Sequence, residues 1–291
     1  MTLATDFQPD QQPARWDNHV GVYEAVFEPL SLAFARHALD RLDLRVGDRL
    51  IDIGAGTGGV ALLAAARGAD VLATDASPGM AARIVARASA MLRARGRVLA
   101  AIMNGMALEV PADSFDAAIS TFGVILFPDA AAGMREMARV LKPGGRAAVL
   151  TWTRPERYEL AVRLLDAIAQ VHGPLPPPAS LPAQLRFKEP EDFRALLTAS
   201  GLAVEEIVAI EESWTLPSAR WIADNIAFAP GMAAMTDGLG SDRDSVMRLF
   251  VETLERDRGT GAVVLTAVAH LGIARKPAES AGGDDERVTK G

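Results

Sequence analysis

The sequence contains no cysteine among its 291 residues. This absence excludes disulfide bonds, thiolate metal ligands and cysteine nucleophiles, and it fits a reducing compartment such as the cytoplasm. Histidine and tyrosine are scarce, with four and two residues respectively, so few side chains are available as a general base. Neither histidines nor paired acids recur at the spacing of metal ligands, and we therefore expect no metal site.

Long apolar runs and an excess of basic residues are also lacking. No run is long enough to span a bilayer, and the N-terminal stretch MTLATDFQPDQQPARW lacks the basic and apolar regions of a signal peptide. The formal net charge of −7 argues against a nucleic-acid partner, because phosphate binding normally requires a basic patch. We expect a soluble, cytoplasmic protein without stable membrane insertion; the sequence does not indicate an oligomeric state.

What the sequence does contain is an alternation of short apolar segments with helical ones. The expected strands are residues 49–53, 70–75, 97–103, 115–121 and 143–152, and the expected helices between them are residues 59–68, 77–96 and 129–142. Strands that are apolar on both faces and alternate with helices predict a parallel sheet covered on both sides. Right-handed crossovers then produce a doubly wound α/β fold.

The alternation changes after Trp152. Two further strands, residues 202–214 and 261–276, are separated from the rest by helical stretches. We therefore expect one domain over residues 15–275: a mostly parallel, seven-stranded, Rossmann-like sheet with helical lid insertions after the fifth and sixth strands. The lid insertions are residues 154–188 and 215–258, the N-terminal cap helices lie within 15–45, and residues 1–14 and 276–291 are expected to be disordered. Such insertions lie over the carboxyl ends of the strands, where open α/β sheets bind ligands.

A glycine loop, LIDIGAGTGG, follows the first strand, and Asp75 ends the second. Gly54, Gly56 and Gly58 allow a tight turn that brings a helix N-terminus close to a ligand. A carboxylate at the tip of the next strand suits the two hydroxyls of a ribose. The pair indicates an adenosine-type cofactor but leaves its identity open. An NAD(P)-dependent oxidoreductase remains an alternative, because the loop also satisfies the dinucleotide-binding pattern.

The ordered set DIGAGTGG, TDAS, NGMAL, SFDAAIS and LKPGG resembles the class I S-adenosylmethionine-dependent methyltransferases. The resemblance is to the small-molecule branch (methyltransferase type 11), which includes the ubiquinone and menaquinone biosynthesis enzymes. It covers residues 45–152 well, the N-terminal helical region loosely and the lid hardly at all. It implies S-adenosyl-L-methionine as cofactor and methyl transfer to a small molecule as activity. A non-catalytic cofactor-binding protein of the same fold remains a further alternative.

The resemblance also implies roles for individual residues. Gly54, Ala55 and Gly56 would pass along the methionine and ribose, and Asp52 would orient this loop. Asp75 would bind the ribose, and the residues at the adenine would be Ala76, Asn104, Gly105 and Met106. Thr121 and Phe122 would lie near the reacting methyl group. The family usually has an aspartate in place of Asn104. The amide oxygen of asparagine can accept the same hydrogen bond.

The acceptor side carries weaker signals, because an in-line methyl transfer needs alignment more than a dedicated catalytic group. His19 and Tyr23 share one face of an expected helix and are the candidate catalytic pair. The alternative is a surface histidine and a ring that packs on the cofactor. Trp152, Trp214, Trp221, Phe228 and Met232 are the expected substrate pocket, although each could equally be a core residue. We expect an apolar quinone-, phenol- or isoprenoid-like acceptor, methylated on oxygen or carbon.

Overall fold

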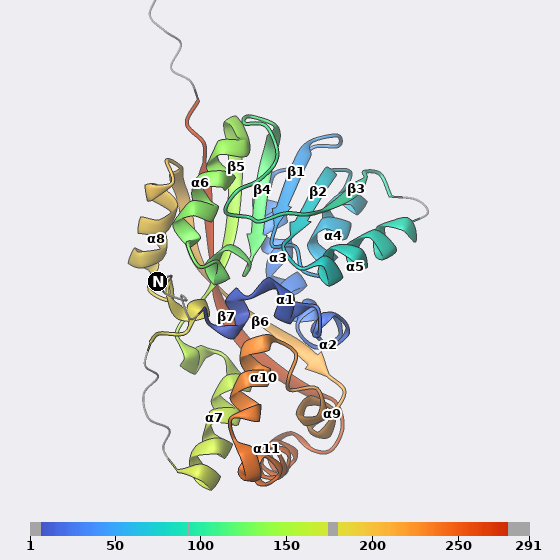
Figure 1. The fold of residues 1–291 in the computed structure, drawn as a ribbon, viewed down its shortest axis with the longest axis vertical. Coiled ribbons are helices and arrows are strands. Elements are labelled where there is room, and N and C mark those ends of the chain that lie inside the picture. The colour runs from blue at the N-terminus through green and yellow to red at the C-terminus, as the bar shows by residue number, and fades with distance from the viewer. Residues whose placement is uncertain (1–6, 92–93, 174–179, 279–291) are drawn as a thin grey trace, which may run out of the picture.

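The computed structural model describes residues 7–91, 94–173 and 180–278, which form a twisted seven-stranded sheet covered on both faces by helices (Figure 1). The strands are β1 (Arg49–Ile53), β2 (Asp70–Asp75), β3 (Val98–Ile102), β4 (Phe115–Thr121), β5 (Leu141–Trp152), β6 (Ala203–Leu216) and β7 (Val263–Arg275). Their order is β3-β2-β1-β4-β5-β7-β6, and β7 is antiparallel to both of its neighbours. The prediction of a mostly parallel, seven-stranded α/β sheet is confirmed.

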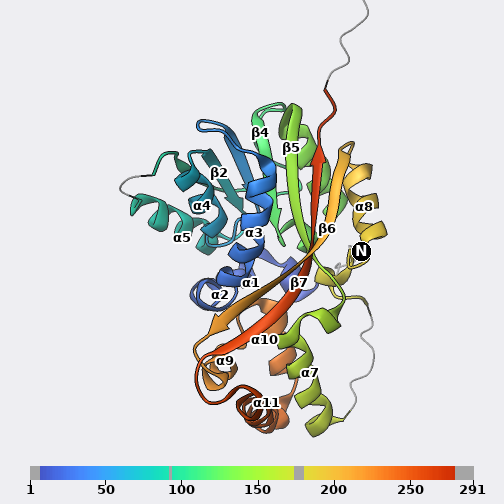
Figure 2. The ribbon, with the colours of Figure 1, turned by 180° about the vertical axis from the view of Figure 1, so that it is seen from behind.

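Helices α3, α4 and α5 cover one face of the sheet, and α6 and α8 cover the other (Figures 1 and 2). The helices are α1 (Pro13–Trp16), α2 (Val20–Val26), α3 (Glu28–Leu42), α4 (Gly59–Arg67), α5 (Pro78–Ser89), α6 (Ala130–Val140), α7 (Glu159–His172), α8 (Pro190–Ala199), α9 (Ala219–Asp224), α10 (Pro230–Asp237) and α11 (Arg243–Arg258). Ser77 begins α5 as expected, because its hydroxyl accepts a 3.1 Å hydrogen bond from the Met80 N–H.

The central strands are apolar on both faces because helices cover both. Leu50 and Ile51 are neighbours on β1, so they point to opposite faces, yet both are fully buried. The carboxyl ends of the parallel strands point toward the N-terminal segment and α10, which lie below the sheet in Figure 1.

The two longest strands run beyond the sheet and carry the lid. The pairing of β5 with β7 ends at Trp152 and Ala269, whereas residues 263–268 of β7 continue to pair with β6. The outer parts of β6 and β7 therefore form a two-stranded ribbon, around which α7, α9, α10 and α11 gather (Figure 2). Helix α7 follows β5, and α9 to α11 lie between β6 and β7.

The expected disorder of residues 1–14 is wrong for residues 7–14. A 3₁₀ helix (Pro9–Gln11) and α1 lie here, and together with residues 7–8, 12 and 17–19 we call them the N-terminal strap. Its polar side chains find backbone partners on the lid: the Gln8 side chain accepts from Ala183 N at 2.7 Å, and Asp10 accepts from Gly231 N at 2.7 Å. Residues 7–14 thus have a composition typical of disordered segments, but contacts with residues that are distant in sequence hold them in place. Residues 1–6 lie outside the described ranges.

Lys276, the first residue of the expected disordered tail, has defined partners in the structure. The Lys276 ammonium group donates to the Asp113 carboxylate at 2.7 Å and to the Leu141 carbonyl at 2.8 Å, which fixes residue 276 against the sheet. Residues 279–291 lie outside the described ranges. None of the helices in the described ranges combines the length and the apolarity that crossing a membrane requires.

Candidate cofactor and acceptor site

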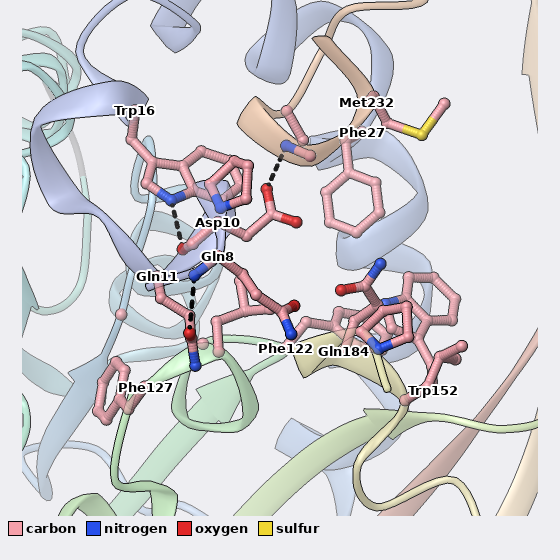
Figure 3. A pocket seen from close by; sticks show the side chains of 18 of the residues that line it. Gln8, Asp10, Gln11, Trp16, Phe27, Phe122, Phe127, Trp152, Gln184 and Met232 are labelled. Carbon is pink, nitrogen blue, oxygen red and sulfur yellow. Dashed lines mark hydrogen bonds between the residues drawn. The ribbon is translucent and has the colours of Figure 1, made fainter. Parts of the chain in front are cut away.

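A large cavity lies between the carboxyl ends of the strands, the N-terminal strap and the lid (Figure 3). Its volume is 1390 Å³, above the range of about 300–1000 Å³ that is typical for small-molecule sites. One side is formed by Gly54, Gly56 and Asp75, and the other by lid residues that include Phe228 and Met232. The cavity therefore has room for two ligands that meet.

The glycine loop borders this cavity in a conformation that other residues rarely adopt. Gly54 and Gly56 have φ values of 71° and 56°. A Cβ atom on Gly54 would lie 3.0 Å from the Cα atom of Gly123, which follows β4. The backbones after β1 and β4 thus touch, which leaves no room for a side chain at Gly54.

Asp75 lies at the end of β2 with its carboxylate in the cavity wall. One oxygen accepts from Gly56 N at 2.8 Å, and the other from Ser77 N at 2.9 Å. Burial raises the pKa of this carboxyl to about 6, although the two backbone hydrogen bonds oppose the rise. Each oxygen retains a free lone pair, so the carboxylate can accept from two further hydroxyl groups.

Asp52 and Thr121 lie behind the glycine loop. Asp52 Oδ2 and the Thr121 hydroxyl are buried without a hydrogen-bond partner in the described part of the chain. Both side chains border a void of 10 Å³ that also touches Gly54 and Ala55, and Thr121 borders the large cavity as well. Burial, followed by the charge of Asp75, raises the Asp52 pKa to about 8.

The expected adenine-binding residues line the same cavity as Gly54 and Asp75. Asn104, Gly105 and Met106 are together at its wall, as is Ala76. The Asn104 amide oxygen accepts from Met106 N at 3.0 Å and keeps a second lone pair for a ligand.

An aromatic wall continues the cavity toward the lid. Phe122 has a φ of 60°, a strained value for a residue with a side chain, and its ring stacks on Trp152 at 4.2 Å between centroids. Trp152 stacks in turn on Tyr158 at 4.9 Å. Phe27 lies parallel to Phe228 at 5.8 Å, so rings from the sheet, the N-terminal helices and the lid form one apolar surface.

The expected substrate pocket is divided by the structure. Trp152, Phe228 and Met232 line the cavity, but Trp214 and Trp221 do not. Trp214 is buried on β6 against Tyr158, and Trp221 packs against the lid core. The structure thus places these two tryptophans away from the cavity: Trp214 is buried, and Trp221 is partly buried against the core of the lid.

His19 and Tyr23 occupy different surroundings. His19 does not line the cavity, and its Nδ1 donates to the Ala227 carbonyl at 2.9 Å, so it ties the strap to the lid. Tyr23 does line the cavity and packs edge-on against Trp16. Burial and the nearby charge of Glu28 hold the Tyr23 pKa well above its ordinary value, so the hydroxyl keeps its proton at neutral pH. This geometry fits the alternative of a packing ring better than a catalytic base.

Several residues of the site carried no signal in the sequence. The strap contributes Gln8, Asp10, Gln11 and Trp16 to the cavity wall. The Pro/Gln-rich sequence around them is typical of disordered segments and therefore did not indicate a binding role. The second such feature is Glu28, which is buried at the start of α3. In the described ranges, no group of three His, Asp or Glu side chains is placed to hold a metal ion.

Glu28 links the N-terminal helices to the glycine loop. Its carboxylate accepts from the Thr57 hydroxyl, from Gly59 N at 3.1 Å and from the Arg87 guanidinium at 2.7 Å. Arg87 also donates to the Thr57 carbonyl at 2.9 Å. Because Gly59 begins α4, the carboxylate satisfies a helix N-terminus while it fixes the loop.

Comparison with known proteins identifies the central part of the chain. Residues 50–145 match a family model described as a methyltransferase domain. An uncharacterized protein of Mycobacterium tuberculosis is 35% identical over 179 residues, which are 60% of this chain and 63% of that protein. A demethylmenaquinone methyltransferase of Corynebacterium efficiens is 36% identical over 143 residues, 47% of this chain and 58% of that enzyme. The chain thus spans less than two thirds of the length of these relatives.

Solved structures extend the similarity to almost the whole fold. A putative methyltransferase from Bacillus halodurans covers 84% of this chain with all of its own length, at 17% identity and a TM-score of 0.54. The [4+2]-cyclase SpnF covers 94% of this chain with 97% of its own, at 19% identity and a TM-score of 0.60. At such identities the likeness concerns the fold alone. Residues 50–145 thus match the methyltransferase domain family, and the chain has the Rossmann-like fold of the methyltransferase structures to which it is similar.

Proposed function

We propose that this protein binds S-adenosylmethionine and transfers its methyl group to an apolar small molecule held under the lid. The observation that carries the proposal is the single cavity in which the glycine loop and Asp75 face an aromatic wall. A methyl transfer needs a donor site and an acceptor site in one water-poor space, and the volume of 1390 Å³ accommodates both.

The residues present fit the cofactor. The Asp75 carboxylate is held by two backbone N–H groups and has lone pairs left for the ribose hydroxyls. The unpartnered Asp52 Oδ2 and Thr121 hydroxyl are buried polar atoms beside the glycine loop, where the ammonium group of the methionine part would satisfy them. Gly54 and Gly56 line the cavity between these two groups of residues.

The chemistry needs little from side chains. The bound cofactor supplies a methyl group on a positively charged sulfur, which is a good leaving group. The protein's part is to orient the acceptor and to exclude water, and the stacked rings of Phe122 and Trp152 offer a flat apolar surface for this purpose. We do not assign the base to His19, since it lies outside the cavity lining.

The finer proposal concerns the acceptor. We infer a quinone-, phenol- or isoprenoid-like molecule that is methylated on carbon or oxygen. The aromatic wall supports this, and so does the similarity to enzymes named demethylmenaquinone methyltransferases.

The first test is calorimetric titration with S-adenosylmethionine, S-adenosylhomocysteine and NADH. We expect micromolar binding of the two sulfur compounds, and an Asp75→Ala variant should bind them at least about tenfold more weakly. The control is Asp70→Ala at the opposite end of β2, where Asp70 pairs with Arg97 on the surface. This variant should bind as the wild type does. Binding of NADH alone would overturn the proposal in favour of an oxidoreductase.

A second measurement addresses the acceptor. Formation of S-adenosylhomocysteine is followed with naphthoquinols, phenols, prenyl alcohols and polar amines as acceptors. Turnover of the ring-containing or prenyl compounds would support the proposal, whereas methylation of polar amines alone would contradict the acceptor class. Cofactor binding without any turnover would favour a non-catalytic protein or, as the fold of SpnF illustrates, a different reaction.

A further inference from the structure

Asp10 is an acidic side chain in the wall of an otherwise mainly apolar cavity. It belongs to the N-terminal strap, and its Oδ1 accepts a 2.7 Å hydrogen bond from Gly231 N at the start of α10 (Figure 3). In the part of the chain that the structure describes, its Oδ2 has no hydrogen-bond partner. In the view of Figure 3 the free oxygen of this carboxylate points toward Phe27, which lines the same cavity.

The surroundings of this carboxylate are unfavourable for a charge. Phe27 and Phe228 stack in parallel nearby, and Met232 continues the same apolar surface. Burial accordingly raises the Asp10 pKa, while the Gly231 hydrogen bond and the charge of His19 oppose the rise. Asp10 lines the cavity, so a ligand that brings a donor can supply the hydrogen bond that the protein does not give to Oδ2.

A purely structural role accounts for only half of the side chain. The bond to Gly231 N fixes the strap to the lid, but an asparagine oxygen would accept this bond equally well. The structural role thus leaves the second oxygen unexplained. In the view of Figure 3 this second oxygen points toward Phe27, a ring of the aromatic wall where the acceptor is proposed to lie.

We propose that Asp10 selects the acceptor, because its Oδ2 accepts a hydrogen bond from a hydroxyl or ammonium group on an otherwise apolar, ring-containing molecule. Oδ1 meanwhile keeps the strap closed on the lid. This inference rests on the proposed function and adds the chemical feature by which the acceptor is recognised. Asp10 is thus a specificity-determining residue that touches the acceptor. The aromatic wall contributes affinity for the ring, whether or not the ligand carries a donor group.

The test compares three probes that share a ring system. Protein saturated with S-adenosylhomocysteine is titrated calorimetrically with 2-naphthol, 2-naphthylmethylamine and 2-methoxynaphthalene. The first two carry a hydroxyl or an ammonium donor, and the third has a similar shape but no donor. We expect at least one donor-bearing probe to bind the wild type about tenfold more tightly than 2-methoxynaphthalene, because a hydrogen bond to a charged group has about this effect. The preferred probe distinguishes hydroxyl from ammonium.

The Asp10→Asn variant separates recognition from folding. Its amide oxygen still accepts from Gly231 N, so hydrogen exchange in residues 7–12 should match the wild type and S-adenosylhomocysteine should bind normally. The preference for donor-bearing probes should fall to about twofold or less. Asp10→Ala removes both interactions, so it should lose the preference and also speed exchange in the strap.

Two results would overturn the inference: equal binding of all three probes by the wild type, or an unchanged preference in Asp10→Asn. Failure of the proposed function would look different, because the wild type would then not bind S-adenosylhomocysteine at all. That result would remove the acceptor role of Asp10 together with the proposal on which it rests.

Discussion

The carboxylate of Glu28 accepts a 3.1 Å hydrogen bond from the backbone N–H of Gly59, at the point where α4 leaves the glycine loop. The contact joins a helix outside the matched methyltransferase segment to the loop at that segment's start. The N-terminal helices are therefore part of what gives the cofactor loop its shape.

Replacement of Glu28 by glutamine should destabilise the protein and weaken cofactor binding. The neutral side chain leaves the mostly buried Arg87 guanidinium without its close charge partner, which should lower the free energy of unfolding by about 1–3 kcal/mol. Urea denaturation and titration with S-adenosylhomocysteine measure the two effects. The control is Glu24→Gln, which removes the pair with the more exposed Arg83 and only a longer, 3.8 Å contact with Arg87, so its expected loss is smaller. Equal losses in both variants would contradict a special role for Glu28.

Alanine at Gly54 should damage the loop more than alanine at Gly144. Both glycines have positive φ values, 71° and 80°, so both variants carry the backbone strain of about 1–2 kcal/mol. Only at Gly54 does the new Cβ approach a backbone atom, Gly123 Cα at 3.0 Å, whereas nothing lies within 4 Å at Gly144. Gly54→Ala should thus be the less stable variant in urea and should lose S-adenosylhomocysteine binding. Similar behaviour of the two variants would show that strain alone, not the contact, matters.

Asp52 should make the protein less stable as the pH rises. Its folded-state pKa is raised to about 8, against about 3.9 in an unfolded chain, so the folded state holds the proton more tightly. This contribution is fully present below about pH 4 and is lost as the pH rises through 8. Asp75, with a pKa of about 6, has lost its similar contribution before pH 8.

The measurement is the free energy of unfolding between pH 6.5 and 8.5. The wild type should lose at least about 1 kcal/mol more than Asp52→Asn over this range, since one pKa unit corresponds to about 1.4 kcal/mol. Parallel profiles for the two proteins would rule out Asp52 as the titrating group. If the cofactor's ammonium group approaches Asp52, binding at pH 7 should also release a proton, which calorimetry in buffers of different ionisation enthalpy detects.

Asp17 should keep the strap in its ordered conformation. Its carboxylate accepts from the Ser77 hydroxyl at 2.6 Å and from Gly79 N at 2.8 Å, so it fixes the strap to the start of α5. In Asp17→Ala, hydrogen exchange in residues 13–19 should accelerate roughly fivefold, as expected for the loss of a helix-capping bond. The control is Asp40→Ala, which removes a surface pair with Arg67 and should leave the strap unchanged. Unchanged exchange in Asp17→Ala would mean that other contacts hold the strap.

The strands of the sheet and the residues expected to bind the cofactor could be predicted because short, continuous stretches of sequence indicate them. Strands buried on both faces appear as continuous apolar runs, so the bounds expected for β1, β2 and β4 agree with the structure. The glycine loop and Asp75 are each adjacent to a strand end, and parallel strands bring these ends to one edge of the sheet.

The lid and the strap could not be predicted in this way. Trp152 and Trp214 both lie near the ends of expected strands, yet one lines the cavity and the other is buried outside it. Which side each ring faces depends on how β6 and β7 leave the sheet. The partners Asp10 and Gly231 are separated by 221 residues, so no local pattern could indicate their contact.

The ribbon formed by β6 and β7 limits how the cavity can admit a ligand. Because the same two strands run from the sheet into the lid, rotation of the lid would break their shared ladder of backbone hydrogen bonds. The strap is held by a few side-chain contacts and can detach at much lower cost. Under the proposed function, detachment of the strap should therefore limit the exchange of acceptor and product. Turnover should then respond to substitutions in residues 7–19 even where the chemical step is untouched.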